Sequence, residues 1–185
     1  DFALNFYNCF QFPYINDSSV IETVPYLQKT VFYEIFVDRF ARGDKKKDDS
    51  YITMEWNEKP TPKSFAGGDL EGIIKKIPYL KRLGVNGIYL TPIFTSVSNH
   101  KYDISDYYEI DPHFGIKETL RTLVKKAHEA GMKILLDAVF NHVSENHPFF
   151  QDVKKNGERS PYFHYFKSKN GKFECFSSCQ YMPKW

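Results

Sequence analysis

Along residues 31–139, three short runs of strand-forming residues alternate with two amphipathic helical segments, and this alternation limits the folds open to the chain. The expected strands are residues 31–37, 85–90 and 133–139. They contain few polar positions, as expected for parallel strands covered on both faces. Parallel neighbours joined by a helix require right-handed crossovers. Both an open doubly wound sheet and a (β/α)8 barrel begin in this way.

Two helices are expected between these strands. In the first, Asp69 can act as the N-cap, and apolar residues then repeat at helical spacing as far as Gly84. Pro78 lies inside this segment, so we expect a kink or a restart there. The second helix has its apolar face between residues 116 and 127 and ends at Gly131.

The segment after the first strand distinguishes the two folds. A nucleotide-binding sheet needs a tight glycine-rich turn at that point, whereas the polar residues 38–68 follow here. In a barrel, long loops after the strands build the functional site. The sequence therefore predicts an α/β fold, a (β/α)8 TIM barrel of which the chain holds only the first three strands.

We expect three regions along the chain. Residues 1–30 have the irregular composition of a lead-in. Residues 31–142 form the first part of the barrel. Residues 143–185 have no clear period and many aromatic residues, which indicates a long excursion between barrel units or the start of a small subdomain inserted after the third strand.

Composition argues against two classes of partner. Hydrophobic residues make up 42% of the 185 residues and the net charge is +2, typical of a soluble domain with a substantial core. No apolar run reaches the roughly 18 residues of a membrane span. The chain begins at Asp1 without a methionine or a signal peptide. We expect no nucleic-acid or membrane partner. The N-terminal residues do not indicate a cellular compartment.

The three cysteines allow more than one interpretation. Cys9, Cys175 and Cys179 are an odd number, which suits a disulfide framework poorly. The last two have a spacing that some metal sites use, but only His164 lies near them in sequence. Free thiols, a disulfide and a metal site all stay open.

Two segments could carry chemistry. Residues 137–142 place Asp137, Asn141 and His142 at the end of the third expected strand, where barrel sites lie. An acidic residue in an apolar strand is costly unless it is paired. Residues 99–107 offer an aromatic ring, an imidazole and two carboxylates in the loop after the second strand. The alternatives are a plain strand end and a polar loop that caps its own turns.

Together, these segments resemble one family. Asp-x-Val-x-Asn-His at residues 137–142 is similar to the first conserved region of the α-amylase superfamily of glycoside hydrolases. The strand at 31–39, the helix start at 67–70 and the turn at 83–92 resemble its first two barrel units. Residues 99–103, followed by Ile110-Asp111-Pro112, most resemble its cyclomaltodextrinase, neopullulanase and maltogenic amylase branch.

The resemblance implies roles for matched residues. Tyr102 would stack under the sugar ring just before the cleaved bond, and His142 would hydrogen-bond that sugar at its 6-hydroxyl. His100 would line the same subsite. Asp137 would support the charged groups of the site from behind, with a basic partner outside this sequence. Asn141 would order the loop.

The resemblance also implies that a calcium loop has been lost. Oxygen ligands would stand at residues 42, 44, 47, 48, 67 and 69, but Arg42 and Lys47 are cations, and calcium needs six to eight oxygens. We therefore expect no metal or other cofactor. Our hypothesis is that the two cations replace the metal and pair with Asp44, Asp48 and Asp69. The alternative is a lost site with both side chains in solvent.

The activity implied by the resemblance is retaining hydrolysis of α-1,4, and in some members α-1,6, bonds of maltodextrins or cyclodextrins. Such enzymes use two carboxylates, which in this superfamily follow later strands, so no residue here is expected to be catalytic and the chain alone should be inactive. The expected partners are an α-glucan oligosaccharide, the remainder of the chain and a second copy bound through a missing N-terminal domain. A transglycosylase and a non-catalytic sugar-binding relative are the alternatives.

Overall fold

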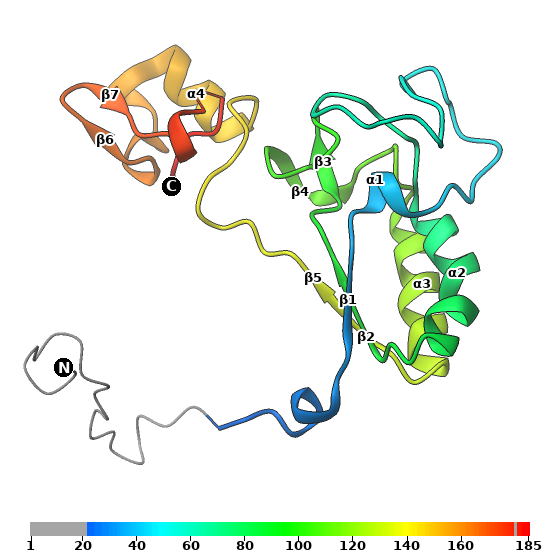
Figure 1. The fold of residues 1–185 in the computed structure, drawn as a ribbon. Coiled ribbons are helices and arrows are strands. Elements are labelled where there is room, and N and C mark those ends of the chain that lie inside the picture. Colours follow the sequence, from blue (N-terminus) through cyan, green and yellow to red (C-terminus); the bar gives the residue numbers. More distant parts are fainter. Residues whose placement is uncertain (1–21, 180) are drawn as a thin grey trace, which may run out of the picture. The chain divides into compact units, whose positions relative to one another are not determined.

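The computed structural model describes residues 22–179 and 181–185 (Figure 1). The chain divides into two compact units, residues 1–30 and 31–185. In the first unit, the described residues contain one 3-10 helix, Pro25–Lys29. Most of the predicted lead-in, including Cys9, lies outside the described residues, and the expected division at residue 143 stays a prediction.

A three-stranded parallel sheet forms the centre of the second unit. It contains β1 (Phe32–Ile35), β2 (Gly87–Leu90) and β5 (Lys133–Leu136) in the order β1-β2-β5. In register, Ile35 pairs with Leu90, and Leu90 with Leu136. The alternation of strands and helices is thereby confirmed. Among the described residues, the outer edges of β1 and β5 have no partner strand.

All three expected strands are two or three residues longer than the observed ones, and the second begins at Gly87 rather than Val85. The first ends at Ile35 because the short helix α1 (Val37–Phe40) begins directly after it. The third ends at Leu136, and Asp137 donates its backbone N–H to the carbonyl of Leu90 at 3.2 Å as the last link to β2. Asp137 therefore follows the strand rather than lying inside it.

Helices α2 (Leu70–Arg82) and α3 (Lys117–Glu129) pack together on one face of the sheet (Figure 1). The Asp69 side chain accepts a hydrogen bond from the N–H of Gly72, as expected of an N-cap. Of the kink or restart expected at Pro78, the restart is wrong because α2 is a single continuous helix, and the kink stays a prediction. Pro78 lies on its exposed side, where water can bond the carbonyl that lacks an N–H partner.

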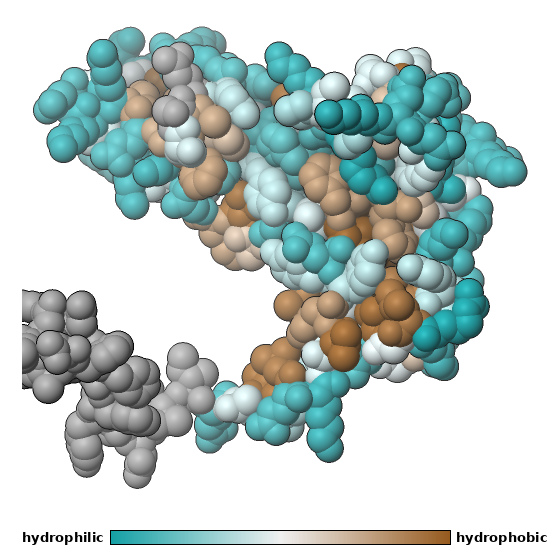
Figure 2. Space-filling view, viewed as in Figure 1, coloured by the Kyte–Doolittle hydropathy of each residue, from teal (hydrophilic) through white to brown (hydrophobic). Residues whose placement is uncertain are grey.

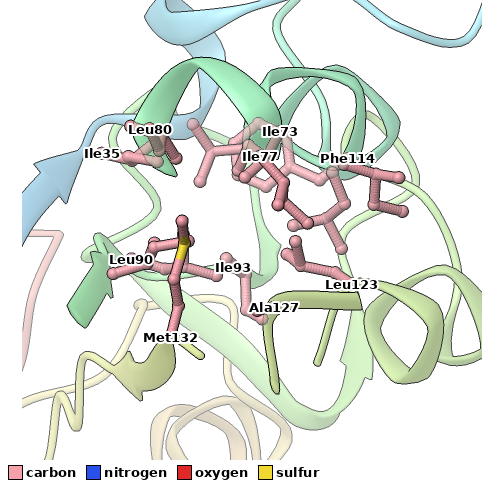
Figure 3. Close-up of a cluster of buried hydrophobic side chains, with 14 of the residues drawn as sticks. Ile35, Ile73, Ile77, Leu80, Leu90, Ile93, Phe114, Leu123, Ala127 and Met132 are labelled. Carbon is pink, nitrogen blue, oxygen red and sulfur yellow. The ribbon is translucent and has the colours of Figure 1, made fainter. Parts of the chain in front are cut away.

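The main core fills the space between these helices and the sheet. The labelled side chains in Figure 3 point toward one another from α2, α3, the strands and the neighbouring loops. Most are at most 2% exposed: Ile35, Ile73, Leu80, Leu90, Ile93, Phe114, Leu123, Ala127 and Met132. Figure 2 shows hydrophobic surface exposed in the region of the sheet.

The loops after β1 and β2 differ in how much regular secondary structure they contain. Residues 41–69 form turns and irregular backbone. The loop after β2 contains an antiparallel pair that the sequence did not predict, β3 (Phe94–Ser96) with β4 (Ile104–Ile110). Polar residues within β4 hide the alternation that would have indicated a strand.

Residues 143–185 pack around a second, aromatic cluster. It includes Val143, Phe150, Val153 and Phe166, with Trp185 packed against it. The elements are α4 (Pro148–Asn156), two 3-10 helices (Gly157–Arg159 and Phe163–Tyr165), the pair β6 (Ser168–Lys169) and β7 (Lys172–Phe173), and a last 3-10 helix, Phe176–Ser178. No helix in the described part of the chain is long and apolar enough to cross a bilayer.

Candidate active site

Four of the predicted residues meet at the carboxyl end of the sheet. Tyr102, Asp137, Asn141 and His142 line a hollow of about 480 Å³ together with residues 138–140 and Phe176. The loops after β2 and β5 bring them together because the carboxyl ends of parallel strands share one edge of the sheet. The hollow has an aromatic wall and a carboxylate, which suits a ligand with both apolar and hydroxyl faces.

Asp137 holds two tyrosines in place. The Tyr102 hydroxyl donates to Asp137 Oδ2 at 2.9 Å, and Tyr89 of β2 also hydrogen-bonds this carboxylate. Burial, followed by the hydrogen bond to Asp137, raises the pKa of Tyr102 well above its usual value and that of Tyr89 to about 12. Both phenols therefore keep their protons at neutral pH and act as donors.

His142 is buried and both of its ring nitrogens have protein partners. Nε2 lies 3.1 Å from the carbonyl oxygen of Tyr102, and Nδ1 lies 3.1 Å from the side-chain amide of Asn141. Since a carbonyl only accepts, Nε2 carries the proton and Nδ1 accepts from Asn141. Burial lowers the pKa of His142, so the ring is neutral near pH 7. A sugar hydroxyl would have to replace one of these two partners.

Asn141 connects the end of this loop to residues near the end of the described chain. Its side chain is fixed by His142, and its carbonyl oxygen accepts from the N–H of Trp185 at 3.2 Å. The side chain itself is exposed. These contacts place it to order the loop after β5.

His100 lies beside Tyr102 but lines a different hollow. The ring centroids are 5.9 Å apart, and His100 Nδ1 accepts the backbone N–H of Tyr102 at 3.1 Å. Its ring borders a neighbouring hollow of about 620 Å³ together with Asp103, Glu145 and Tyr181. Burial lowers the pKa of His100 as well. The structure thus brings together Tyr102, Asp137 and His142, with His100 at their side.

Sequence reasoning missed two residues of this site. Phe176 stacks on His142, with 4.6 Å between centroids and 27° between planes, and its side chain lines the hollow while 43% exposed. Nothing in the sequence distinguishes Phe176 from the other aromatic residues of 143–185. Tyr89 lies in β2, paired in register with Leu135 of β5, and only that register shows that it reaches Asp137.

The loop after β1 holds one of the expected cation pairs. Lys47 Nζ lies 2.9 Å from Asp69 Oδ2 and also donates to the carbonyls of Gly67 at 2.7 Å and His113 at 3.1 Å. Arg42 donates to the carbonyl of Ala66 rather than to an aspartate.

The other two expected pairs are not found. Asp44 accepts the N–H of Lys46, and Asp48 accepts from the N–H and hydroxyl of Ser50. Both carboxylates cap local turns because residues two positions along the chain offer nearer donors.

Two of the three cysteines belong to the described residues. Cys175 and Cys179 form no disulfide with each other there. No group of three or more His, Cys, Asp or Glu side chains in the described part of the chain is arranged to hold a metal ion.

Comparison with known proteins identifies the fold. A model described as the alpha amylase catalytic domain matches residues 34–184. The chain belongs to the alpha-amylase family. Its parallel strands and covering helices are therefore part of the TIM barrel of this family, as the sequence predicted.

Individual members of the alpha-amylase family are similar at the level of sequence and structure. A cyclomaltodextrinase from Thermoanaerobacter pseudethanolicus is 51% identical over 162 residues, which is 88% of this chain and 28% of that protein. An intracellular maltogenic amylase from Bacillus subtilis is 45% identical over 181 residues, 95% of this chain and 31% of that protein. A ligand-free cyclic α-maltosyl-(1→6)-maltose hydrolase from Arthrobacter globiformis has a TM-score of 0.80 at 39% identity, covering 86% of this chain and 38% of that one. The chain spans less than a third of the length of the two curated relatives.

Proposed function

We propose that the complete protein containing this chain is a retaining α-glucan hydrolase that cleaves α-1,4 bonds of maltodextrins or cyclodextrins, with α-1,6 bonds as a second linkage to test. The observation that carries the proposal is the hollow shared by Tyr102, Asp137 and His142 at the carboxyl edge of the sheet. The relatives are named for activities on cyclomaltodextrin and maltose-containing sugars. Their names support this substrate class.

In this proposal the described residues bind and orient the glucan. The Tyr102 ring offers a face for the C–H side of a glucose unit, and its hydrogen bond to Asp137 sets the angle of that ring. His142, stacked on Phe176, forms a second wall that can hydrogen-bond a sugar hydroxyl by exchanging a protein partner. His100 borders the next hollow and can contact the adjoining part of the glucan.

Bond cleavage is assigned to carboxylates outside this sequence. A retaining glycosidase needs a nucleophile and an acid/base about 5–5.5 Å apart. Asp137 is engaged by two tyrosines, and Asp103 accepts from the hydroxyls of Ser96 and Ser98. Both aspartates are therefore supporting groups, and the 185-residue chain alone is proposed to be inactive.

We further propose that the protein needs no calcium in the loop after β1. The Lys47 ammonium contacts three oxygens there, from Asp69, Gly67 and His113. A cation already held by those oxygens supports the proposal that no metal binds there.

Homodimerisation through an N-terminal domain remains part of the proposal, and size-exclusion chromatography with light scattering tests it.

The decisive assay incubates the complete purified protein with maltotriose, β-cyclodextrin and pullulan and follows the products by chromatography. Release of glucose and maltose from maltotriose and β-cyclodextrin, with retained anomeric configuration, is the expected result. Longer products formed by transfer would favour a transglycosylase. Binding of maltotriose without turnover would favour a non-catalytic relative. A Tyr102→Ala variant should lose activity at least tenfold, while Tyr108→Ala, at a residue that is 85% exposed, serves as the matched control.

A further inference from the structure

Lys101 lies between His100 and Tyr102 and has an unusual backbone conformation. Its φ is +61°, in the left-handed region that residues other than glycine seldom adopt. Left-handed conformations are unfavourable for non-glycine residues because Cβ comes close to the following carbonyl oxygen. The turn sends the Lys101 side chain into the interior, where it is 0% exposed, while the rings of its two neighbours border the hollows.

The buried ammonium has a partner for each of its three protons. Lys101 Nζ lies 2.8 Å from Asp111 Oδ2, donates to the carbonyl of Ser96 at 3.0 Å, and lies 3.4 Å from Nδ1 of His113. The rings of Phe65 and Phe114 flank it at 5.7 and 5.3 Å. This set of partners fixes the position of the ammonium far more narrowly than apolar packing would.

Asp111 joins the two ends of the loop around this ammonium. Its Oδ2 also accepts the N–H of Ser96 at 3.0 Å, and its Oδ1 accepts the N–H of His113 at 3.0 Å. Ser96 ends β3 and Asp111 directly follows β4. The Lys101–Asp111 pair therefore connects the middle of residues 97–103 to both strands of the β3–β4 pair.

The local hydrogen bonds carry this constraint to the site. The N–H of Lys101 donates to Ser98 Oγ at 3.0 Å, and the N–H of Tyr102 donates to His100 Nδ1 at 3.1 Å. Tyr102 then reaches Asp137 through its hydroxyl and His142 through its carbonyl. A shift of Lys101 would be passed directly to these contacts, because Tyr102 is the next residue.

We propose that Lys101 is a positioning residue that holds Tyr102 and His100 in the geometry needed to bind the reacting sugar. The inference rests on the proposed glucan hydrolysis. A buried ion pair often stabilises no more than apolar packing of the same volume. The strained backbone and the buried charge are therefore better explained by placement of the two neighbouring rings than by stability alone.

The test compares Lys101→Met with Lys101→Met/Asp111→Asn in the complete protein. Lys101→Met leaves the Asp111 carboxylate buried without its cation, so both the thermal midpoint and kcat/KM for maltotriose should fall. The double variant removes the unpaired charge and should recover most of the midpoint. Its kcat/KM should remain about 10- to 100-fold below wild type, the size of effect that misplacing a substrate-positioning group can have. Recovery of both quantities would show a purely structural role and overturn the proposal.

A second readout does not depend on activity. Hydrogen exchange of the peptide covering residues 97–105 should be faster in the double variant than in wild type, while exchange in α2 stays unchanged. Unchanged exchange at 97–105 would overturn the positioning role even if the protein proved to have no glucan activity. The matched control is Lys117→Met, which removes an exposed ion pair with Glu109 (2.6 Å). This variant should alter neither kcat/KM for maltotriose nor the hydrogen exchange of residues 97–105.

Discussion

Replacing Lys47 by Met tests the idea that this ammonium stands where a metal would otherwise be needed. Methionine is unbranched and only one heavy atom shorter than lysine, so the change removes a charge without opening a large cavity. The Lys47 side chain is 10% exposed and Asp69 is 2% exposed, so the pair is largely shielded from water. Breaking a buried pair by removing one partner costs about 3–5 kcal/mol.

The local structure places the cost at the lower end of that range. Asp69 keeps three backbone donors, the N–H groups of Gly43 at 2.9 Å, Asp44 at 3.1 Å and Gly72 at 2.7 Å. The carbonyls of Gly67 and His113 lose a donor, which costs about 1 kcal/mol each if water cannot replace it. We expect Lys47→Met to lower the free energy of unfolding by about 3 kcal/mol.

Urea denaturation of the complete protein, with calcium or with a chelator, measures the effect. Wild type should have the same midpoint in both. Lys45→Met, at an exposed position in the same loop, is the control and should change little. Lys47→Asp should be less stable than wild type and should be the variant that calcium restores. The reasoning would be refuted if Lys47→Met cost less than about 0.5 kcal/mol, the range typical of ordinary surface changes. A wild-type midpoint that falls in chelator would refute it as well.

Three further predictions follow from the site and the core. Phe176→Ala should weaken maltotriose binding by about 1 kcal/mol or more, measured by calorimetry, because it removes an aromatic wall of the hollow, whereas Tyr165→Ala, an exposed aromatic outside it, should not. Gly72→Ala should destabilise the fold by about 1–3 kcal/mol in urea, because a Cβ there would lie 2.0 Å from the carbonyl oxygen of Ala41; a neutral result would contradict the close packing. The free energy of unfolding should fall as the pH drops below about 6.5, because burial lowers the folded-state pKa of four histidines and the unfolded chain then binds more protons; a His147→Gln variant should flatten this slope, and an unchanged slope in that variant would contradict the reasoning. The four are His100, His113, His142 and His147.

The sequence predicts the parts of this fold that local chemistry determines. Residue type and spacing predict the alternation of strands and helices and the N-cap at Asp69, and the structure contains both. The restart at Pro78 failed because exposure of that residue lets the helix continue. The end of the third strand was misplaced because the apolar run extends past Leu136, while pairing with β2 ends at that residue.

The site was predicted less completely because several of its contacts are long-range. Tyr102, Asp137 and His142 were found through motif resemblance and converge in one hollow. Phe176 reaches it from a segment without periodicity. Lys101 is a charged residue in a polar loop, and residue type alone places such a side chain in water. Its burial depends on Asp111, ten positions along the chain, and on a backbone turn that residue type does not indicate.

The free edge of β5 has a consequence during synthesis on the ribosome. Among the described residues the strand has a partner on one side only, and Leu136 and Phe140 nearby are 40% and 73% exposed. Translation adds about 5–20 residues per second, so a following barrel strand would arrive seconds later. During that interval the unpaired backbone can accept a strand from another nascent chain on the same polysome. Slower translation or crowded polysomes should therefore lower the soluble yield of this protein, and chaperones that cover apolar strand edges should restore it.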